Sequence, residues 1–297
     1  MERPAHLKSH HTKIFLDSGN PVETRRAISL LGFLDGQTTN PTLIAAHPAA
    51  QEKLKSGNKF SKPEVLALYR DIVREISALI PHGSVSVEVF ADEKTYADNL
   101  FEQATEMFKW IPNAHIKFQL SVQGLRAAYW GVGQGFSPIR INMTLCFSLE
   151  QAAAVHAATR GARHGDVYVS PFVGRLDDIG KNGMDLVRNI LQLYKKGDRH
   201  VAVLAASIRN LDHLMASLQC EADIVTAPLK VLEAWAAQGL PLPDSNFLYR
   251  PKNLATIPYQ DIALGQHFFN FAIQNELTAQ GIRKFANDWN ALLVSPP

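Results

Sequence analysis

Lys117 is the residue of this sequence best placed for covalent chemistry. It lies in the stretch His-Ile-Lys-Phe-Gln-Leu at residues 115–120, which is typical of a buried strand and is followed by a helix-capping residue, Ser121. Burial disfavours the charged ammonium group and lowers its pKa, and a neutral amine can attack a carbonyl carbon. Position alone favours a simpler interpretation, in which the lysine extends from the strand end to solvent. The nucleophile hypothesis gains weight because other reactive side chains occur at equivalent points of the chain.

Polar side chains occur at or just beyond the ends of most other short apolar runs. They are Asp17, Asn40, Glu88, Asn142, Thr144, Ser170, Arg175, Ser207, Arg209 and Thr226. Carboxylates can transfer protons, and arginines can bind anionic groups through paired hydrogen bonds. If the runs are parallel strands of one barrel, their ends meet at a common face. The set then predicts a polar ring of one amine, two carboxylates and two guanidinium groups.

The two carboxylates, Asp17 and Glu88, can also be interpreted as structural. Asp17 shortly precedes Asn20 and Pro21, so it could belong to a capping turn at the start of a helix. Glu88 interrupts the apolar face expected of a strand covered on both sides, but it could be the partner of an arginine. The sequence leaves both interpretations open.

The arginines and Ser207 likewise have two interpretations. Arg175 could form a salt bridge with Asp177 or Asp178, and Ser207 could cap the helix that follows it. In a β/α barrel, however, phosphate groups often bind in the loops after the seventh and eighth strands, where helix amides, hydroxyls and arginines converge. Ser207 and Arg209 lie after the seventh predicted strand, which makes them candidate phosphate ligands.

Short apolar runs and longer helical segments alternate along the chain and would position these groups. The predicted strands are residues 14–16, 33–37, 85–89, 115–120, 139–144, 167–169, 200–206 and 224–226. The predicted helices are residues 21–31, several segments up to 79, then 93–108, 122–129, 149–158, 184–194, 210–218 and 229–237. Because these units lack a Gly-x-Gly-x-x-Gly motif after the first strand, they predict an α/β fold of the (β/α)8 TIM-barrel type, not an open doubly wound sheet.

The remainder of the chain is predicted to extend this barrel, not to form a second domain. We expect one domain over residues 1–297, with the barrel at about 13–238 and a C-terminal extension at about 239–297. The proline-rich segment 239–258 lacks periodicity and is either a linker or a loop beside the barrel mouth. Residues 268–276 and 279–293 are predicted to be additional terminal helices. Residues 131–135 form a glycine-rich insert before the fifth strand.

Composition limits the possible partners and compartments. The 297 residues are 46% hydrophobic and 20% charged, with a net charge of +2, which gives no basic excess for nucleic acid or for a membrane surface. The two cysteines, Cys146 and Cys220, lack the number and spacing of a disulfide scaffold or metal site, which fits a reducing cytoplasm. Residues 1–13 do not resemble a signal peptide, and no apolar stretch approaches a membrane span. We expect a cytoplasmic protein that acts on small molecules.

The motifs, in this order, resemble those of the transaldolase family from Asp17 to the terminal helices. The matching stretches are Asp-Ser-Gly-Asn-Pro at 17–21, Thr-Thr-Asn-Pro at 38–41, Ser-Val-Glu-Val at 86–89, Ile-Lys at 116–117 with Gln-Gly-Leu at 123–125, Asn-Met-Thr-Leu-Cys-Phe-Ser at 142–148, Ser-Pro-Phe-Val-Gly-Arg at 170–175 and Ala-Ser-Ile-Arg-Asn at 206–210. Residues 118–122 and 131–138 depart from the family pattern. The first departure bears on the surroundings of Lys117, and the second is expected at the surface.

The resemblance implies a Schiff-base transferase that uses no metal and no organic cofactor. Lys117 would attack the ketone of sedoheptulose 7-phosphate or fructose 6-phosphate, and the bond between the third and fourth carbons would break. Asp17 would take the proton of the fourth-carbon hydroxyl, and Glu88 and Thr144 would move protons through a water. The three-carbon dihydroxyacetone unit would pass to glyceraldehyde 3-phosphate or erythrose 4-phosphate, a reaction of the non-oxidative pentose phosphate pathway.

The resemblance also implies substrate-binding roles and a homodimer. Asn40, Asn142 and Ser170 would hold the hydroxyl groups of the three-carbon unit, and Arg175, Ser207 and Arg209 would bind phosphate. Carboxylates are suited to the proton transfers, and arginines are suited to bind a distant phosphate that positions the reacting carbons. The resemblance suggests a homodimer joined through helical surfaces.

Two other functions stay open. The related fructose 6-phosphate aldolases, which release free dihydroxyacetone, carry glutamine at the position of Glu88 and tyrosine at that of Phe172. Because a phenylalanine cannot hydrogen-bond a hydrolytic water, the residues here favour the transferase. The other alternative, a non-catalytic barrel that binds sugar phosphates, would lack the lysine or a carboxylate, and this chain has them.

Overall fold

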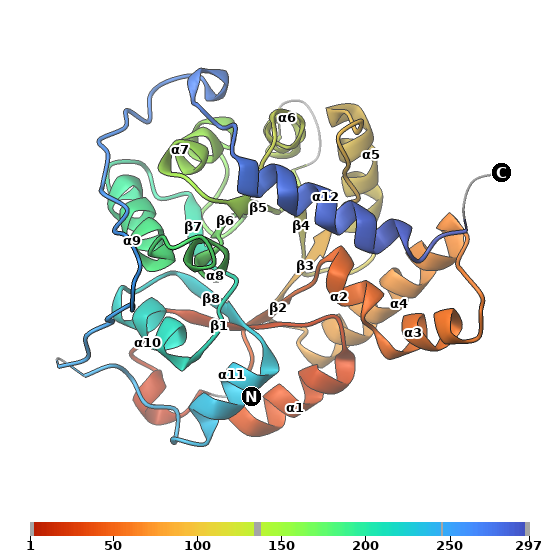
Figure 1. Cartoon of the computed structure of the whole chain (residues 1–297), viewed down its shortest axis with the longest axis horizontal. Helices are drawn as coiled ribbons and strands as arrows, with labels where there is room; N and C mark the ends of the chain where they lie inside the picture. Colours follow the sequence, from red (N-terminus) through yellow and green to blue (C-terminus); the bar gives the residue numbers. More distant parts are fainter. Residues whose placement is uncertain (1–2, 134–137, 245, 295–297) are drawn as a thin grey trace.

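Eight parallel strands form a closed barrel in chain order (Figure 1). The computed structural model describes residues 3–133, 138–244 and 246–294. The strands are β1 (Lys13–Asp17), β2 (Gly36–Thr38), β3 (Ser84–Glu88), β4 (Ala114–Gln119), β5 (Ile141–Cys146), β6 (Val167–Pro171), β7 (Val201–Ala205) and β8 (Ile224–Ala227). The last strand pairs with the first, so the predicted (β/α)8 TIM barrel is confirmed.

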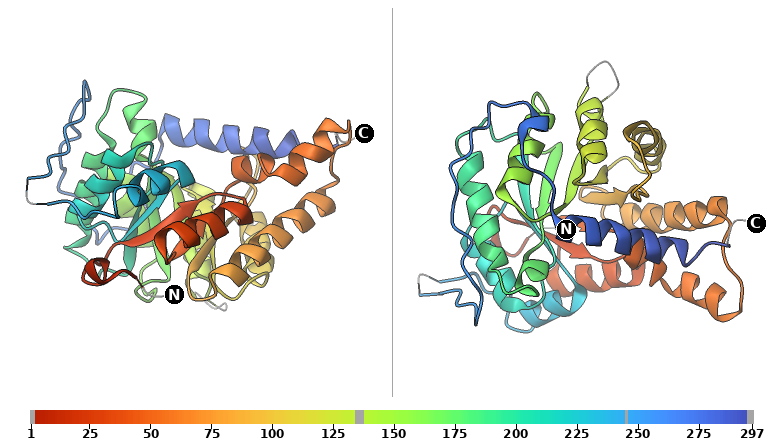
Figure 2. Two further views of the ribbon diagram at one scale, coloured as in Figure 1. Left: turned by 90° about the horizontal axis from the view of Figure 1, so that it is seen from below. Right: turned by 45° about the horizontal axis from the view of Figure 1, so that its top comes forward.

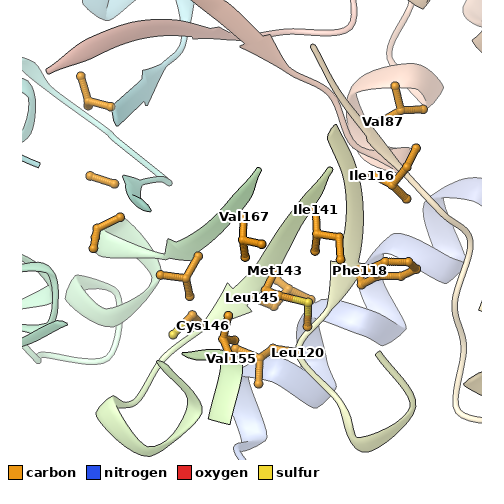
Figure 3. Close-up of a cluster of buried hydrophobic side chains, with 14 of the residues drawn as sticks. Val87, Ile116, Phe118, Leu120, Ile141, Met143, Leu145, Cys146, Val155 and Val167 are labelled. Carbon is orange, nitrogen blue, oxygen red and sulfur yellow. The ribbon is translucent and has the colours of Figure 1, made fainter. Parts of the chain in front are cut away.

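Strand alternation divides the barrel into an apolar outer face and a mixed interior. On β4, Ile116 and Phe118 belong to the large buried cluster, whereas His115, Lys117 and Gln119 share the opposite face. Figure 3 shows side chains of the outer cluster from neighbouring strands, among them Val87, Ile116, Phe118, Ile141, Met143 and Val167. The helices that cover the barrel bury this layer, and the interior is left for polar side chains and a second, smaller apolar layer.

A separate apolar layer fills the middle of the barrel. It consists of Phe15, Tyr168, Ala202, Leu204, Ala206 and Ile224. The pocket at the carboxyl ends of the strands is lined by Leu204 and Ala206, and the cavity at the amino ends is lined by Phe15 and Tyr168. The layer therefore separates the two ends of the barrel.

Helices surround the barrel, and several of them begin at a polar cap just after a strand. They are α1 (Pro21–Leu31), α2 (Pro41–Ala45), α3 (Pro48–Lys55), α4 (Lys62–Leu79), α5 (Ala97–Phe108), α6 (Val122–Gly131), α7 (Leu149–Ala158), α8 (Val173–Asp177), α9 (Gly183–Tyr194), α10 (Leu211–Gln219), α11 (Leu229–Ala236) and α12 (Glu276–Asn290), with 3-10 turns η1 (Ala5–Leu7) and η2 (Phe268–Asn270). Asn20, Asn40, Ser121 and Ser148 each accept a hydrogen bond from a backbone N–H of the first turn. These caps fix where the chain turns at the rim.

Several predicted bounds need correction. Strand β2 occupies Gly36–Thr38 instead of 33–37, and α5 begins at Ala97 instead of 93. Helix α8 was not predicted. The predicted helix 268–276 is wrong: only the 3-10 turn η2 forms, and Phe271 is already extended. Part of the predicted insert 131–135 lies outside the described residues, and its first residue closes α6.

Helix α12 lies across one end of the barrel. Figure 1 shows it in blue, running from the neighbourhood of α7 to α2, and the side view in Figure 2 places it over one end. The hydroxyl of Thr278 donates to the carbonyl of Leu145 at 3.0 Å, and the side chains of Thr42 and Asp288 are hydrogen-bonded to each other. The carboxyl ends of the strands are therefore partly covered by a helix distant in sequence.

The predicted proline-rich segment runs along α9. The N–H of Asn182 donates to the carbonyl of Ala255 at 2.8 Å, and Asn189 Nδ2 donates to the carbonyl of Ile257 at 2.9 Å. Of the two interpretations of this segment, these contacts support the linker to α12. Among the helices described, none has the length and apolar character required to cross a membrane.

Candidate active site

A pocket of about 180 Å³ opens at the carboxyl ends of the strands and contains most of the predicted side chains. Those in its lining are Asp17, Asn40, Lys117, Thr144, Ser170, Phe172, Arg175, Ser207, Arg209 and Thr226. Glu88 and Asn142 lie directly behind it, paired in register with Lys117 on either side. A larger cavity of about 470 Å³ at the amino ends, around His115 and Tyr168, contains none of these residues. The predicted ring therefore forms one site.

Lys117 points into the barrel and not to solvent. Its residue is 4% exposed, and its Nζ lies 3.1 Å from Glu88 Oε2. The same Nζ donates a hydrogen bond to the carbonyl of Thr39 at 3.0 Å. The interpretation in which this lysine extends to solvent is therefore wrong, and the amine lies where a small carbonyl compound in the pocket can reach it.

Glu88 is a buried carboxylate held by Lys117 and Gln119. Burial raises its pKa, and the positive charge of Lys117 opposes this rise. Gln119 Nε2 donates to Oε1 at 2.9 Å, and no arginine is its partner among the described residues. A carboxyl group with a raised pKa beside an amine is suited to exchange protons with it or with a bound water.

A network from α4 orders both members of this pair. The Thr39 hydroxyl donates to the carbonyl of Ser86 at 2.7 Å, so the Tyr69 hydroxyl, 2.6 Å away, must donate to Thr39. The Tyr69 oxygen in turn accepts the backbone N–H of Glu88 at 2.8 Å. Because the carbonyl of Thr39 accepts from Lys117, one chain of hydrogen bonds supports the amine and the carboxylate together.

Asp17 faces the pocket as a second carboxylate of raised pKa. Burial raises it, while Lys117 and the hydrogen bond from Thr38 lower it. Thr38 Oγ1 donates to Asp17 Oδ1 at 2.8 Å, so the Thr226 hydroxyl, 2.7 Å from Thr38, must donate to it. The cap of α1 is Asn20 alone, whose side chain accepts from its first turn, and the capping interpretation of Asp17 is not observed.

Ser170 and Asn40 present polar groups on the walls, and Asn142 lies behind Ser170. Ser170 Oγ donates to Asn142 Oδ1 at 2.6 Å, and Asn142 Nδ2 donates to Ser86 Oγ at 3.1 Å. Asn40 uses its side-chain oxygen to cap α2, which leaves its amide NH₂ group to face the pocket. These side chains are fixed before any ligand binds, which favours specific recognition of hydroxyl groups.

Thr144 lies beside an irregularity in β5. The register with β6 shifts between Met143 and Cys146, and Leu145 has a φ of 63°, in the left-handed region. Such a bulge redirects the neighbouring side chains. The Thr144 hydroxyl is buried without a hydrogen-bond partner among the described residues, although it lines the pocket. It is therefore free to bind a water or a reacting hydroxyl.

Arg175 and Arg209 give the rim of the pocket a positive charge. Arg209 pairs with Asp178 at 2.9 Å, and the Arg175 guanidinium carbon lies 5.4 Å from the centre of the Phe172 ring. Burial lowers the pKa of Arg175, and the nearby Arg209 lowers it further. Two adjacent cations of this kind are expected to favour an anion between them.

The structural interpretations of Arg175 and Ser207 are not observed. Asp178 pairs with Arg209, and Asp177 pairs with His213 Nε2 at 2.9 Å, so neither carboxylate holds Arg175. Ser207 has a φ of 58°, and the cap of α10 is Asn210. Both side chains line the pocket, where they can contact a ligand.

Some residues of the site were not predicted. Gln119 lies two positions after Lys117 on the same strand face, a spacing that could have identified it. Lys284 and Phe285 line the pocket from α12, and no local pattern placed them there. Gly281 of α12 packs so closely that a Cβ would lie 2.8 Å from Arg175 Nη1. The terminal helix is thus a wall of the pocket.

Comparison with known proteins agrees with this geometry. The family model described as Transaldolase/Fructose-6-phosphate aldolase matches residues 14–295. Proteins named probable transaldolase are similar: one from Dehalococcoides mccartyi is 38% identical over 74% of this chain and 88% of its own length, and one from Herpetosiphon aurantiacus is 38% identical over 74% and 86%. Another, from Alkaliphilus metalliredigens, is 32% identical over 95% of this chain and 99% of its own. The chain therefore belongs to the transaldolase/fructose-6-phosphate aldolase family.

Proposed function

We propose that the protein is a transaldolase that transfers a dihydroxyacetone unit through a Schiff base on Lys117. The observation that carries this proposal is the buried Nζ of Lys117, 3.1 Å from Glu88 and in the same pocket as Asp17. An amine beside two proton-transfer groups is the set that imine formation and carbon–carbon cleavage require. The donors would be sedoheptulose 7-phosphate or fructose 6-phosphate, in the non-oxidative pentose phosphate pathway.

The first half of the reaction forms the imine. Lys117 must lose a proton before it attacks the ketone, and Glu88, whose pKa is raised by burial, is the adjacent acceptor. Attack gives a carbinolamine, and loss of its hydroxyl as water gives the iminium ion. The unpartnered hydroxyl of Thr144 is available to hold the water that moves these protons.

The second half breaks and remakes a carbon–carbon bond. Asp17 takes the proton from the fourth-carbon hydroxyl, the bond between the third and fourth carbons breaks, and the iminium ion accepts the electron pair. The aldehyde leaves, and the three-carbon unit stays on Lys117 as an enamine. Attack of the enamine on glyceraldehyde 3-phosphate or erythrose 4-phosphate reverses these steps, with Asp17 returning the proton.

The walls would position the sugar. Asn40, Asn142 and Ser170 would bind the hydroxyls of the three-carbon unit, and Arg175, Ser207 and Arg209 would bind phosphate at the rim. Binding the distant phosphate orients the reacting carbons, which can supply much of the rate enhancement. A homodimer, a cytoplasmic location and a single-domain organisation stay predictions.

Trapping of the intermediate tests the proposal. The full chain is incubated with fructose 6-phosphate and sodium borohydride, and intact mass and peptide mapping follow. We expect a three-carbon adduct on Lys117, because reduction converts the imine to a stable amine. If no adduct forms while the sugar phosphate still binds, the non-catalytic barrel becomes the better description.

The phosphate site is tested by replacing Arg209 with alanine. We expect the KM for glyceraldehyde 3-phosphate to rise by roughly 10- to 100-fold, because that is the loss of affinity expected when one charge-assisted hydrogen bond is removed. The KM for unphosphorylated glyceraldehyde should not change, and Arg25→Ala, which removes a surface arginine paired with Glu75, is the matched control. An unchanged KM for the phosphorylated acceptor would exclude Arg209 from the site.

The choice between transferase and aldolase is tested at Phe172. Its ring lines the pocket and offers no hydrogen bond to a water, so the intermediate should persist until an aldehyde arrives. In Phe172→Tyr, we expect release of free dihydroxyacetone relative to transfer to rise by roughly tenfold, as one added hydrogen bond would give. Phe147→Tyr serves as control, because it places the same hydroxyl on the neighbouring ring. The centre of that ring lies 5.6 Å from the centre of the Phe172 ring, and Phe147 does not line the pocket. An equal ratio in both variants contradicts this role of Phe172.

A further inference from the structure

A second group of reactive side chains lies at the other end of the barrel wall. His156 is in the last turn of α7, and Asp198 and His200 belong to the loop that leads from α9 into β7. One donor atom from each residue can be chosen so that all three lie within 4.8 Å of one another. His200 directly precedes the first residue of β7, so the group is at the amino end, whereas the candidate active site is at the carboxyl end.

His156 is buried without a hydrogen bond. The residue is 5% exposed, and neither Nδ1 nor Nε2 has a hydrogen-bond partner among the described residues. Nε2 nevertheless points to Asp198, with 3.3 Å between it and Oδ1. The loop approaches so closely that a Cβ at Gly197 would overlap Nε2. A buried imidazole normally satisfies at least one nitrogen, so this arrangement requires an explanation.

The hydrogen bonds of His200 leave a ring-nitrogen lone pair beside Asp198, the residue to which His156 Nε2 also points. The Thr159 hydroxyl donates to the carbonyl of Val155 at 2.8 Å, so it accepts from His200 Nε2 at 3.0 Å. In the neutral ring, Nδ1 then carries the lone pair, and Nδ1 contacts Asp198 Oδ1. These two atoms are in hydrogen-bond contact, so either a proton shared between them or, once this contact opens, a bound cation must satisfy both lone pairs.

We propose that His156, Asp198 and His200 form a binding site for one divalent transition-metal ion of the zinc class. Two imidazole nitrogens and one carboxylate oxygen are a common protein donor set for Zn²⁺, with bonds of about 2.0–2.2 Å and a water as the fourth ligand. Tetrahedral geometry then puts donors about 3.3 Å apart, which is the separation of His156 Nε2 and Asp198 Oδ1. His200 Nδ1 and Asp198 Oδ1 are closer than this, so the exposed Asp198 side chain must turn away from His200 as the ion binds. The Asp198 side chain is 55% exposed, so the water position faces solvent.

The second shell fits this assignment. The ring N–H of a metal-bound histidine usually donates to an oxygen that fixes its orientation, and Thr159 provides that oxygen for His200. Burial lowers the pKa of His156, which keeps its imidazole in the neutral form that binds metals. The ion would join the end of α7 to the loop before β7. It would stabilise the fold and take no part in the proposed transfer reaction.

Isothermal titration with ZnCl₂ tests the site. The untagged full chain is first treated with a chelator and dialysed, and its melting temperature is recorded with and without zinc. We expect one ion per chain, with a Kd on the order of 1 µM or below, and a melting temperature that rises with zinc concentration. The Asp198→Asn and His156→Gln variants should each lose at least ~100-fold in affinity.

The matched control is His164→Gln, which removes an exposed histidine that contacts the same loop at the carbonyl of Arg199. It should bind zinc like the wild type. Circular dichroism verifies that each variant is folded, and the exposed position of Asp198 makes Asp198→Asn the safer variant. Equal affinity in all variants would assign the zinc to surface histidines, and absence of binding would show that His200 and Asp198 only hydrogen-bond each other. Either result overturns the proposal without affecting the transaldolase assignment.

Discussion

Replacing Lys117 by methionine should abolish transfer, with kcat/KM lower by at least ~10⁴-fold, because no amine is left to form the imine. Methionine is close in size and apolar, so the pocket keeps its shape. A coupled assay with fructose 6-phosphate and erythrose 4-phosphate measures the loss, and borohydride should give no adduct. A retained adduct would place the Schiff base on another lysine, such as Lys284 on the pocket wall.

The same substitution should also change stability. Glu88 would be left buried without its cation, and loss of one partner of a buried pair typically costs about 3–5 kcal/mol, whereas replacing both partners is often neutral or stabilising by about 1–4 kcal/mol. We therefore expect Lys117→Met combined with Glu88→Gln to be more stable than Lys117→Met alone. Urea denaturation of both variants measures the difference, and a less stable double variant would contradict it.

The sign of the pH dependence follows from Glu88. Burial raises the pKa of Glu88 in the folded state, and the positive charge of Lys117 opposes that rise. Removing the charge of Lys117 should therefore raise the pKa of Glu88 further. A carboxyl group with a raised folded pKa binds its proton more tightly when folded, so stability is highest below the unfolded pKa and falls as pH rises through the folded pKa. The free energy of unfolding of Lys117→Met should therefore decrease from acidic to neutral pH, and Glu88→Gln in the same background should remove this contribution.

The second large effect is expected at Asp17. Asp17→Asn should lower kcat by about 10²- to 10⁴-fold, because the amide cannot take the fourth-carbon proton. Imine formation should survive, since it depends on Lys117 and Glu88. Borohydride should then trap the intact six-carbon sugar phosphate, whereas in the wild type it traps the three-carbon unit. A three-carbon adduct formed at the wild-type rate would exclude Asp17 as the base.

The pH dependence of the wild type provides a further readout of Asp17. Burial raises its pKa, with Lys117 and Thr38 acting in the opposite direction. The base must be ionised to accept the proton, so kcat should fall as pH decreases through the raised pKa, at a pH above the ordinary range of an aspartate. This acid limb should be absent from the residual activity of Asp17→Asn.

The strands and many helices could be predicted because their signals are local. Helices α1 and α7 have the predicted bounds, since Asn20 and Ser148 mark where each begins. Helix α8 is too short to show the helical periodicity of apolar residues, and it contains a glycine, so no sequence pattern predicted it. The predicted helix 268–276 is wrong because Phe268 and Phe269 lie in a 3-10 turn, Phe271 is extended, and the cap Asn275 starts α12 later.

The site was predictable where a residue lies near the carboxyl end of its strand, and not where tertiary contacts decide. Lys117, Asp17 and Thr144 lie in the last half of their strands, so barrel geometry alone brings them together. Lys284 and Phe285 come from a helix that no strand rule positions. The partners of the charged groups were likewise not predictable. Asp178, the C-cap of α8, pairs with Arg209 from the loop after β7 rather than with Arg175, and only the packing of these two segments brings that pair together.

The position of α12 determines when, during synthesis of the chain, the pocket becomes complete. A nascent chain that has released α11 from the ribosome already contains all eight strands, with Lys117 and both carboxylates in place. It still lacks Phe285 and Lys284, so its intermediate would stand open to water. Only when translation delivers the segment that Thr278 ties to β5 would the proposed covalent intermediate be shielded from water.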